Sequence, residues 1–277
     1  MKKEKKKKRN IFIYTLFFIT LLLLYARYIE PNNLIIKEYK IENTLLPNSF
    51  DGLKIVHFSD LHYGSTVDIK YLKKVVKLIN KQKPDIVFFT GDLIDKRANL
   101  TNNDIESIKK ELNKIESNIS NFAVNGNHDI KHLEEFEKVL SDNFTILENE
   151  EKLLYFNETT PISIIGLTDA SETKVNYEVF NKENTLFRIV LAHQPDEYNK
   201  IKEYSFNILL SGHSHNGQIR LPFIGALYTP IGSKTFYENY YKLDNREIFI
   251  SNGIGTSTIN LRFGSTPSIN LYRLYAY

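Results

Sequence analysis

The sequence LKIVHFSDLHYGSTVDIKYLKKVVKLINKQKPDIVFFTGDLID, residues 53–95, contains a complete strand–helix–strand unit. Residues 53–58 and 86–89 are apolar runs, which predict two buried strands. Between them, residues 68–82 carry apolar side chains at helical spacing on one face and lysines on the other, which predicts an amphipathic helix. Such a βαβ unit predicts parallel strands joined by a right-handed crossover, and therefore an α/β fold.

The same alternation continues along the chain. Further strands are expected at 34–42, 122–124, 145–147, 152–156, 162–167, 187–192, 208–210, 247–251 and 269–275, and further helices at 104–115 and 131–140. A chain of 277 residues is long enough to bury one large core. Since the sequence shows neither an internal repeat nor a second domain, we expect a single catalytic or binding domain.

Five short clusters of metal-binding residue types occur at or near the ends of expected strands. They are Asp60-Leu61-His62, Gly91-Asp92-Leu93-Ile94-Asp95, Gly126-Asn127-His128-Asp129, His193, and Gly212-His213-Ser214-His215. Loops at one edge of a sheet can converge on one point. Five of the seven histidines lie in these clusters. Imidazole nitrogens, carboxylates and an amide oxygen together suit two divalent transition metals.

The clusters differ in how specific they are. Taken alone, Asp60-Leu61-His62 is better explained as a strand-end loop in which Asp60 caps the following helix. The run from Asn125 to Asp129 is more specific, because Gly126 permits a tight turn and three polar residues follow it at a strand end. Since alternating residues of an extended segment point the same way, His213 and His215 are expected to face one site.

Composition and charge limit the possible functions. The chain has no cysteine, which excludes disulfides and thiolate metal ligands. Its net charge is +3, but the first ten residues contain seven basic residues and one acidic residue. The rest of the chain is therefore mildly acidic, which argues against a nucleic-acid partner.

The N-terminus has the pattern of a membrane anchor. We expect a basic cytoplasmic tail at 1–10, a transmembrane signal-anchor helix at 11–28, a linker and first strand at 29–50, and the main folded domain at 51–277. Because basic flanks remain in the cytoplasm, the domain is expected on the extracytoplasmic side of the cell membrane. A cleaved signal peptide and a buried helix are the alternatives.

The order of the clusters resembles that of the calcineurin-like metallophosphoesterase superfamily. The resemblance is closest to its membrane-anchored branch of phosphodiesterases similar to YkuE and YaeI. It rests on LKIV leading to SDLH at 53–62, HQPD at 193–196, and GHSHNGQIRLP at 212–222. It implies a four-layer α/β/β/α sandwich with two mixed sheets, here with an added N-terminal transmembrane helix.

The resemblance also implies roles for individual residues. One metal ion would be held by Asp60, His62, Asp92 and His215, and a second by Asp92, Asn127, His193 and His213. A hydroxide bridging two such ions, about 3.5–4 Å apart, would attack the phosphorus. His128 would act as general acid, and Asp95 would orient it. The mixed ligand set suits manganese, iron or zinc.

The substrate follows less directly from the sequence. Arg220 and Arg262 are candidates for binding its phosphate, although solvated surface positions explain them equally well. The apolar segment 221–236 suggests acyl chains beside the site. We therefore expect hydrolysis of a phosphodiester or pyrophosphate in a lipid-linked envelope compound, as in a UDP-diacylglucosamine pyrophosphatase or a phospholipid-type enzyme. The alternatives are a protein or small-molecule phosphomonoesterase and a non-catalytic metal-binding scaffold. No obligate protein partner is indicated.

Overall fold

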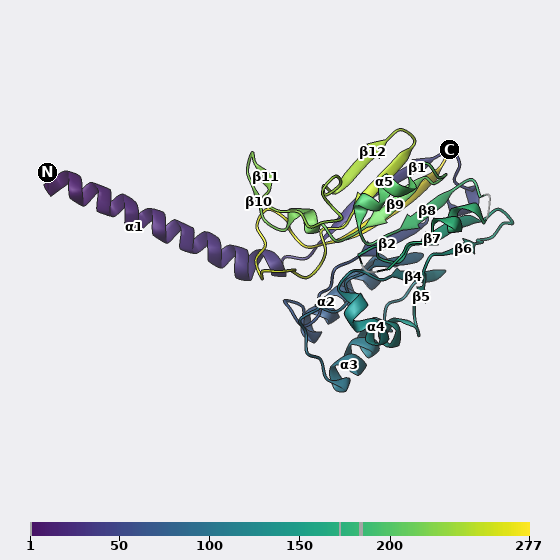
Figure 1. The fold of residues 1–277 in the computed structure, drawn as a ribbon, viewed down its shortest axis with the longest axis horizontal. Coiled ribbons are helices and arrows are strands. Elements are labelled where there is room, and N and C mark those ends of the chain that lie inside the picture. The colour runs from purple at the N-terminus through teal and green to yellow at the C-terminus, as the bar shows by residue number, and fades with distance from the viewer. Residues whose placement is uncertain (1, 172, 183–184) are drawn as a thin grey trace.

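Two mixed β-sheets form the centre of the structure, a computed structural model that describes residues 2–171, 173–182 and 185–277 (Figure 1). The first sheet has the strand order β1-β14-β2-β3-β4-β5. Its strands are β1 (Ile35–Asn43), β14 (Ser268–Ala276), β2 (Lys54–Phe58), β3 (Ile86–Thr90), β4 (Ser120–Val124) and β5 (Thr145–Ile146). β14 runs antiparallel to β2, whereas β2, β3 and β4 are mutually parallel. The predicted βαβ unit is therefore confirmed.

The second sheet has the order β12-β13-β9-β8-β7-β6. Its strands are β12 (Tyr240–Leu243), β13 (Arg246–Ile250), β9 (Ile208–Ser211), β8 (Arg188–Leu191), β7 (Ile162–Gly166) and β6 (Glu150–Leu154). The inner four are parallel, and each edge strand is antiparallel to its neighbour. Both sheets therefore bring the carboxyl ends of adjacent parallel strands to one edge.

Three hydrophobic cores separate four layers. The first core lies between the first sheet and the helices α2 (Ile69–Gln82), α3 (Asn102–Leu112) and α4 (Leu133–Leu140). The second is shared by the inner faces of the two sheets. The third covers the outer face of the second sheet with α5 (Tyr198–Ile201) and the 3-10 helix Tyr177–Asn181. This arrangement confirms the four-layer α/β/β/α prediction, although the last layer contains only short helices.

Local sequence explains why α2 begins and ends where it does. The Asp68 carboxylate accepts a hydrogen bond from Tyr71 N at 2.7 Å, which caps the first turn. Lys83 ends the helix in a left-handed conformation with φ 50°, and Pro84 cannot continue it. The buried face of α2 packs on the first sheet, and burying each large aliphatic side chain stabilises the fold by roughly 1.5–3 kcal/mol.

The N-terminal helix α1 (Lys2–Leu24) projects away from the domain (Figure 1). It continues as a π-helix over Tyr25–Ile29 and a 3-10 turn over Glu30–Asn32. The helical stretch Lys3–Asn32 is long and apolar enough to cross a membrane. Its last part is not a free linker, because the buried Glu30 carboxylate accepts hydrogen bonds from Ser265 N at 2.8 Å and Gly264 N at 3.0 Å.

Candidate metal centre

The five clusters converge where the two sheets meet. The loops after β2, β3 and β4 come from the first sheet, and the loops after β8 and β9 come from the second. All seven predicted ligands lie in these loops, and the described residues contain three groups of side chains whose nitrogen and oxygen atoms lie within 4.8 Å of one another. The first group is Asp60, His62 and His215, and the second is Asp92, His193 and His213. A third group, His62, Asp92 and His128, lies between them.

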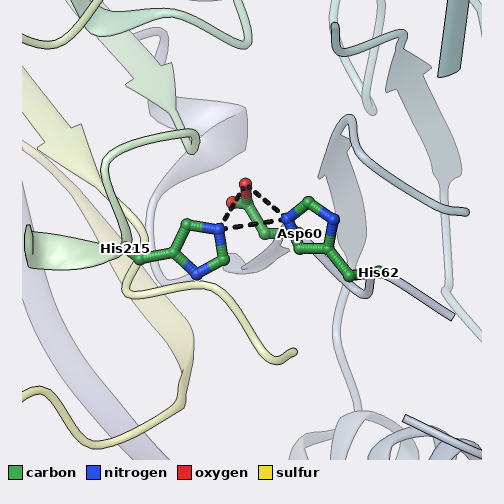
Figure 2. A group of neighbouring side chains, drawn as sticks. All are labelled: Asp60, His62 and His215. Atoms are coloured by element: carbon green, nitrogen blue, oxygen red, sulfur yellow. Dashed lines mark hydrogen bonds and ion pairs between the residues drawn. The ribbon is translucent and has the colours of Figure 1, made fainter. Parts of the chain in front are cut away.

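In the first group, two imidazoles face each other across a carboxylate (Figure 2). His62 Nε2 lies 3.1 Å from His215 Nε2, and His215 Nε2 lies 3.3 Å from Asp60 Oδ1. Asp60 and His62 are completely buried. Two imidazole nitrogens so close together cannot both carry a proton, and a cation between them would be bound by both.

The second group is arranged around Asp92. Its Oδ2 atom lies 3.3 Å from His193 Nε2 and 3.5 Å from His62 Nε2, so this carboxylate lies between the two groups. His193 Nε2 is also 3.1 Å from His213 Nδ1 and 3.2 Å from the Asn127 side-chain oxygen. Asn127 therefore joins this group with a neutral oxygen, a donor type that divalent metals accept.

Asp129 holds the central loops together. Its buried carboxylate accepts hydrogen bonds from Asp92 N at 2.7 Å, Leu93 N at 2.8 Å and Gly126 N at 2.9 Å. A Cβ atom on Gly126 would clash with Asp92 Oδ1, so the close approach of the two loops requires glycine. The loop carrying Asp92 is thereby fixed against the loop that carries Asn127.

The ligand loops adopt an unusual backbone conformation. Asp60, His62, Asp92, His213 and His215 all have positive φ angles. Each such non-glycine residue costs roughly 1 kcal/mol or more, and strain of this kind concentrates at functional sites. The expectation that His213 and His215 lie on an extended segment is wrong, because their φ values are 65° and 48°. The tight turn directs them to different groups, His213 toward Asp92 and His215 toward Asp60.

Burial and charge set the protonation of the histidines. Burial lowers the pKa of His62 to about 3, so its ring is neutral, which is the form that binds metals. Burial also lowers the pKa of His193. The adjacent Asp92 carboxylate has the opposite and larger effect, and it holds the pKa of His193 well above its usual range. A metal ion at His193 therefore competes with a proton. Both environments fit divalent cations.

His128 lies beside the metal-binding groups, with its ring 4.4 Å from that of His62. The backbone N–H of Lys96 donates a hydrogen bond to His128 Nδ1 at 3.2 Å, so the proton of the neutral ring is on Nε2. The Asp95 carboxylate is 3.9 Å from Nδ1 and forms an ion pair with Arg97 at 2.8 Å. The backbone amide of Lys96 therefore forms the hydrogen bond at Nδ1, and Asp95 lies farther from this atom.

The two predicted phosphate-binding arginines are both engaged elsewhere. Arg262 is completely buried, and its guanidinium contacts His215 Nδ1 at 3.1 Å and backbone carbonyls including Gly253 O at 3.0 Å. Arg220 forms an ion pair with Glu238 at 2.7 Å. A buried guanidinium cannot contact a substrate, so Arg262 instead positions the His215 ring from behind. This role was not predictable from its place in the sequence.

A cavity of about 500 Å³ opens directly onto the metal-binding groups. It is lined both by polar residues that include Asp92, Asn127 and His128 and by apolar side chains that include Leu227 and Ile259. Lys96 is exposed at its wall and is the cation that the sequence reasoning missed. Its position directly after Asp95, in a loop expected to reach the site, could have identified it from the sequence.

Comparisons with known proteins agree with this geometry. The sequence pattern of the calcineurin-like phosphoesterase family matches residues 53–217. The uncharacterised metallophosphoesterase YkuE of Bacillus subtilis is 34% identical over 260 residues, which cover 90% of this chain and 88% of YkuE. The phosphodiesterase YaeI of Escherichia coli is 25% identical, over 90% of this chain and 92% of YaeI.

A further relative carries a more specific name. The UDP-2,3-diacylglucosamine pyrophosphatase LpxG of Chlamydia muridarum is 27% identical, over 90% of this chain and 92% of LpxG. The family match and the YkuE match each cover more than half of the chain. The chain therefore belongs to the calcineurin-like phosphoesterase family, within its YkuE- and YaeI-like branch, and is a metallophosphoesterase that hydrolyses phosphoric esters.

Proposed function

We propose that this enzyme uses two divalent metal ions to cleave a phosphodiester or pyrophosphate bond in a lipid-linked compound of the membrane or cell envelope. The observation that carries this proposal is the single cavity shared by the histidine–carboxylate groups and apolar side chains. A phosphate needs the polar lining residues, and an acyl chain needs the apolar ones. The name of LpxG, a pyrophosphatase of a diacylated nucleotide sugar, supports the same substrate class.

The proposed ligand sets follow the two groups of side chains. Asp60, His62, Asp92 and His215 would hold one ion, and Asp92, Asn127, His193 and His213 would hold the other. Bound ions would supply Lewis acidity, neutralise phosphoryl charge and lower the pKa of water. Manganese, iron and zinc all accept these donors. The position of Asp92 between the groups supports its role as the shared ligand.

The chain's own residues would handle the leaving group and the substrate charge. His128 lines the cavity and carries its ring proton on Nε2, where it can be donated to the leaving oxygen. Asp95 holds Arg97, and it contributes negative charge near His62 and His128 without a direct hydrogen bond to either. Lys96 replaces Arg220 and Arg262 as our candidate for binding the phosphate.

Replacing Lys96 with alanine should raise KM for a phosphodiester about tenfold, since a hydrogen bond to a charged group contributes roughly 1.5–3 kcal/mol. The measurement is steady-state hydrolysis of bis(p-nitrophenyl) phosphate. Lys131→Ala is the matched control, because this exposed lysine does not line the cavity. Equal KM values in the two variants would remove Lys96 from the substrate site.

We also propose the membrane arrangement expected from the sequence. Residues 1–10 would lie in the cytoplasm, the apolar part of α1 would span the membrane, and the domain from residue 51 would lie outside. The seven basic residues before the apolar stretch support this direction. Glu30 holds the end of the helix against the domain, so the site stays close to the membrane.

The orientation can be measured by cysteine labelling, because the chain contains no cysteine of its own. An impermeant maleimide added to spheroplasts should label Glu158→Cys, which lies in the exposed turn after β6. It should label Lys6→Cys, in the basic tail, only after the membrane is permeabilised. The reverse labelling pattern would contradict the proposed orientation.

The substrate class is tested with the full-length protein in mixed micelles, since removing residues up to 33 would also remove the Glu30 contacts. With Mn²⁺, kcat/KM for a micelle-borne UDP-diacylglucosamine should exceed that for bis(p-nitrophenyl) phosphate at least about tenfold, because binding of the acyl chains lowers the barrier. A chelator should abolish both reactions. A lipid substrate no better than the soluble diester would end the lipid proposal but leave the enzyme class intact. Faster cleavage of p-nitrophenyl phosphate would favour a phosphomonoesterase.

A further inference from the structure

A short hairpin of exposed apolar side chains projects from the second half of the chain. It is formed by β10 (Arg220–Leu221) and β11 (Gly225–Ala226) and the loop that follows them. The exposed apolar residues are Leu221, Phe223, Ile224, Leu227, Tyr228 and Ile231. Phe223 at the tip is fully exposed, and Ile231 is 84% exposed. Residues 221–233 contain no charged side chain.

Water is a poor environment for this hairpin. Its two paired strands contain only two residues each, and a hairpin of this size is marginally stable by itself. Within the described part of the chain, no element of the domain covers the six side chains. Contiguous apolar patches of this kind mark surfaces that contact a protein, a ligand or a membrane. The surroundings of the hairpin decide which of these applies.

The hairpin lies where α1 leaves the domain (Figure 1). Tyr25, at the end of the apolar helix, lines the same cavity as Leu221 and Pro222 of the hairpin. Tyr25 also packs edge-on against Phe263 at 6.3 Å, and Arg220 N donates to Phe263 O at 2.7 Å. The hairpin and the membrane helix are therefore joined through Phe263.

The base of the hairpin has the side chains expected at a membrane surface. Lys234, the first charged residue after the apolar run, places its ammonium group 5.0 Å from the Tyr228 ring centroid. Tyrosine favours the boundary between lipid and water, and a lysine beside it can reach the headgroups. The tip has neither kind of polar group, so polarity falls from the base toward Phe223.

We infer that the tip of this hairpin, around Phe223 and Ile224, inserts into the membrane leaflet at which α1 ends, as a second anchor. It would reach about 5–10 Å into the boundary between headgroups and acyl chains. Leu227 and Tyr228 of the same hairpin line the catalytic cavity, so insertion places the mouth of that cavity at the lipid surface. The inference rests on the proposed membrane anchoring, and it explains how a lipid-linked phosphate would enter without leaving the bilayer.

The absence of tryptophan from the chain makes a direct test possible. Full-length Phe223→Trp is reconstituted into phosphatidylglycerol vesicles containing phosphatidylcholine with brominated acyl chains, which quench tryptophan at the depth of the bromine. Phe17→Trp in α1 serves as the positive control. Tyr155→Trp, exposed just after β6, serves as the control outside the membrane.

Insertion predicts that brominated lipid reduces the fluorescence of Phe223→Trp to about half or less, because the tip reaches the upper part of the acyl chains. Phe17→Trp should be quenched similarly, and Tyr155→Trp should be unchanged. Quenching of Phe17→Trp but not of Phe223→Trp would overturn the inferred insertion of the hairpin. If neither tryptophan were quenched, both the hairpin insertion and the proposed membrane anchoring by α1 would be overturned. None of these readouts depends on activity, so a failed lipid substrate would not be mistaken for a failed insertion.

Discussion

Asp92→Asn should reduce metal-dependent hydrolysis of bis(p-nitrophenyl) phosphate by about 10³-fold or more, since metal ions contribute several kcal/mol of transition-state stabilisation. The Asp92 carboxylate lies within 3.5 Å of nitrogens from both His62 and His193. Asparagine keeps the shape of the side chain and the oxygen that accepts a hydrogen bond from the backbone N–H of His128. It removes the negative charge between the two proposed ligand groups. The measurement combines initial rates in Mn²⁺ with metal stoichiometry from calorimetry.

The matched control is Asp142→Asn, an exposed carboxylate just after α4 that pairs with Lys109. It should retain wild-type rates and metal stoichiometry. The thermal unfolding of both variants should be compared, so that loss of metal is separated from loss of fold. An Asp92→Asn protein that still binds two metal ions and turns over normally would rule out Asp92 as the shared ligand.

For a substrate with an alkoxide leaving group, His128→Ala should lower kcat by about 10²–10⁴-fold while the protein still binds its metal ions. General acid catalysis contributes a factor of this size. His128 lines the cavity with Nε2 bearing the proton, and the proposed ligand sets do not use it, although it lies close to His62 and Asp92. The loss should depend on the leaving group. It should be small for p-nitrophenolate, which leaves without a proton, and large for an alkoxide.

His132→Ala provides the matched control, since His132 ends the 3-10 helix Asp129–His132 but does not line the cavity. It should show the wild-type rate with both leaving groups. An equal loss for both leaving groups in His128→Ala would indicate that His128 binds substrate rather than donates a proton. A non-catalytic metal-binding scaffold would show no turnover before or after either change.

Much of the fold was predictable because it depends on local periodicity. The alternation of apolar and amphipathic runs around residues 53–95 predicted β2, α2 and β3 within about one residue of their observed bounds. The polar clusters at the ends of parallel strands indicated which residues lie together, but the clusters come from two sheets rather than from the edge of one. The prediction of four layers came from the resemblance to a family, because sequence periodicity does not indicate how many layers a fold has. Short elements such as β10, β11, β12 and α5 were not predicted, whereas mostly apolar runs marked the equally short strands β8 and β9.

The roles of individual side chains depended on contacts between distant segments. Asp95 and Arg262 carry the right chemistry for an orienting carboxylate and a phosphate-binding cation. Asp95 instead forms an ion pair with Arg97. Arg262 is buried behind His215, so it cannot contact the substrate. Lys96 reaches the cavity only because the loop after β3 turns toward it. Such partners are close in space but not in sequence.

The sequence by itself determined the α/β class, the identity and order of the residues that gather at the metal centre, and the apolar N-terminal helix. Periodicity and residue chemistry are properties of the chain, so they can be read before it folds. Only the tertiary structure decided that the loops of two sheets face each other, that Glu30 fastens the helix to the domain, and that the hairpin at Phe223 is left uncovered beside it. Burial and contact arise from the packing of distant segments, and no local pattern encodes which surface remains open.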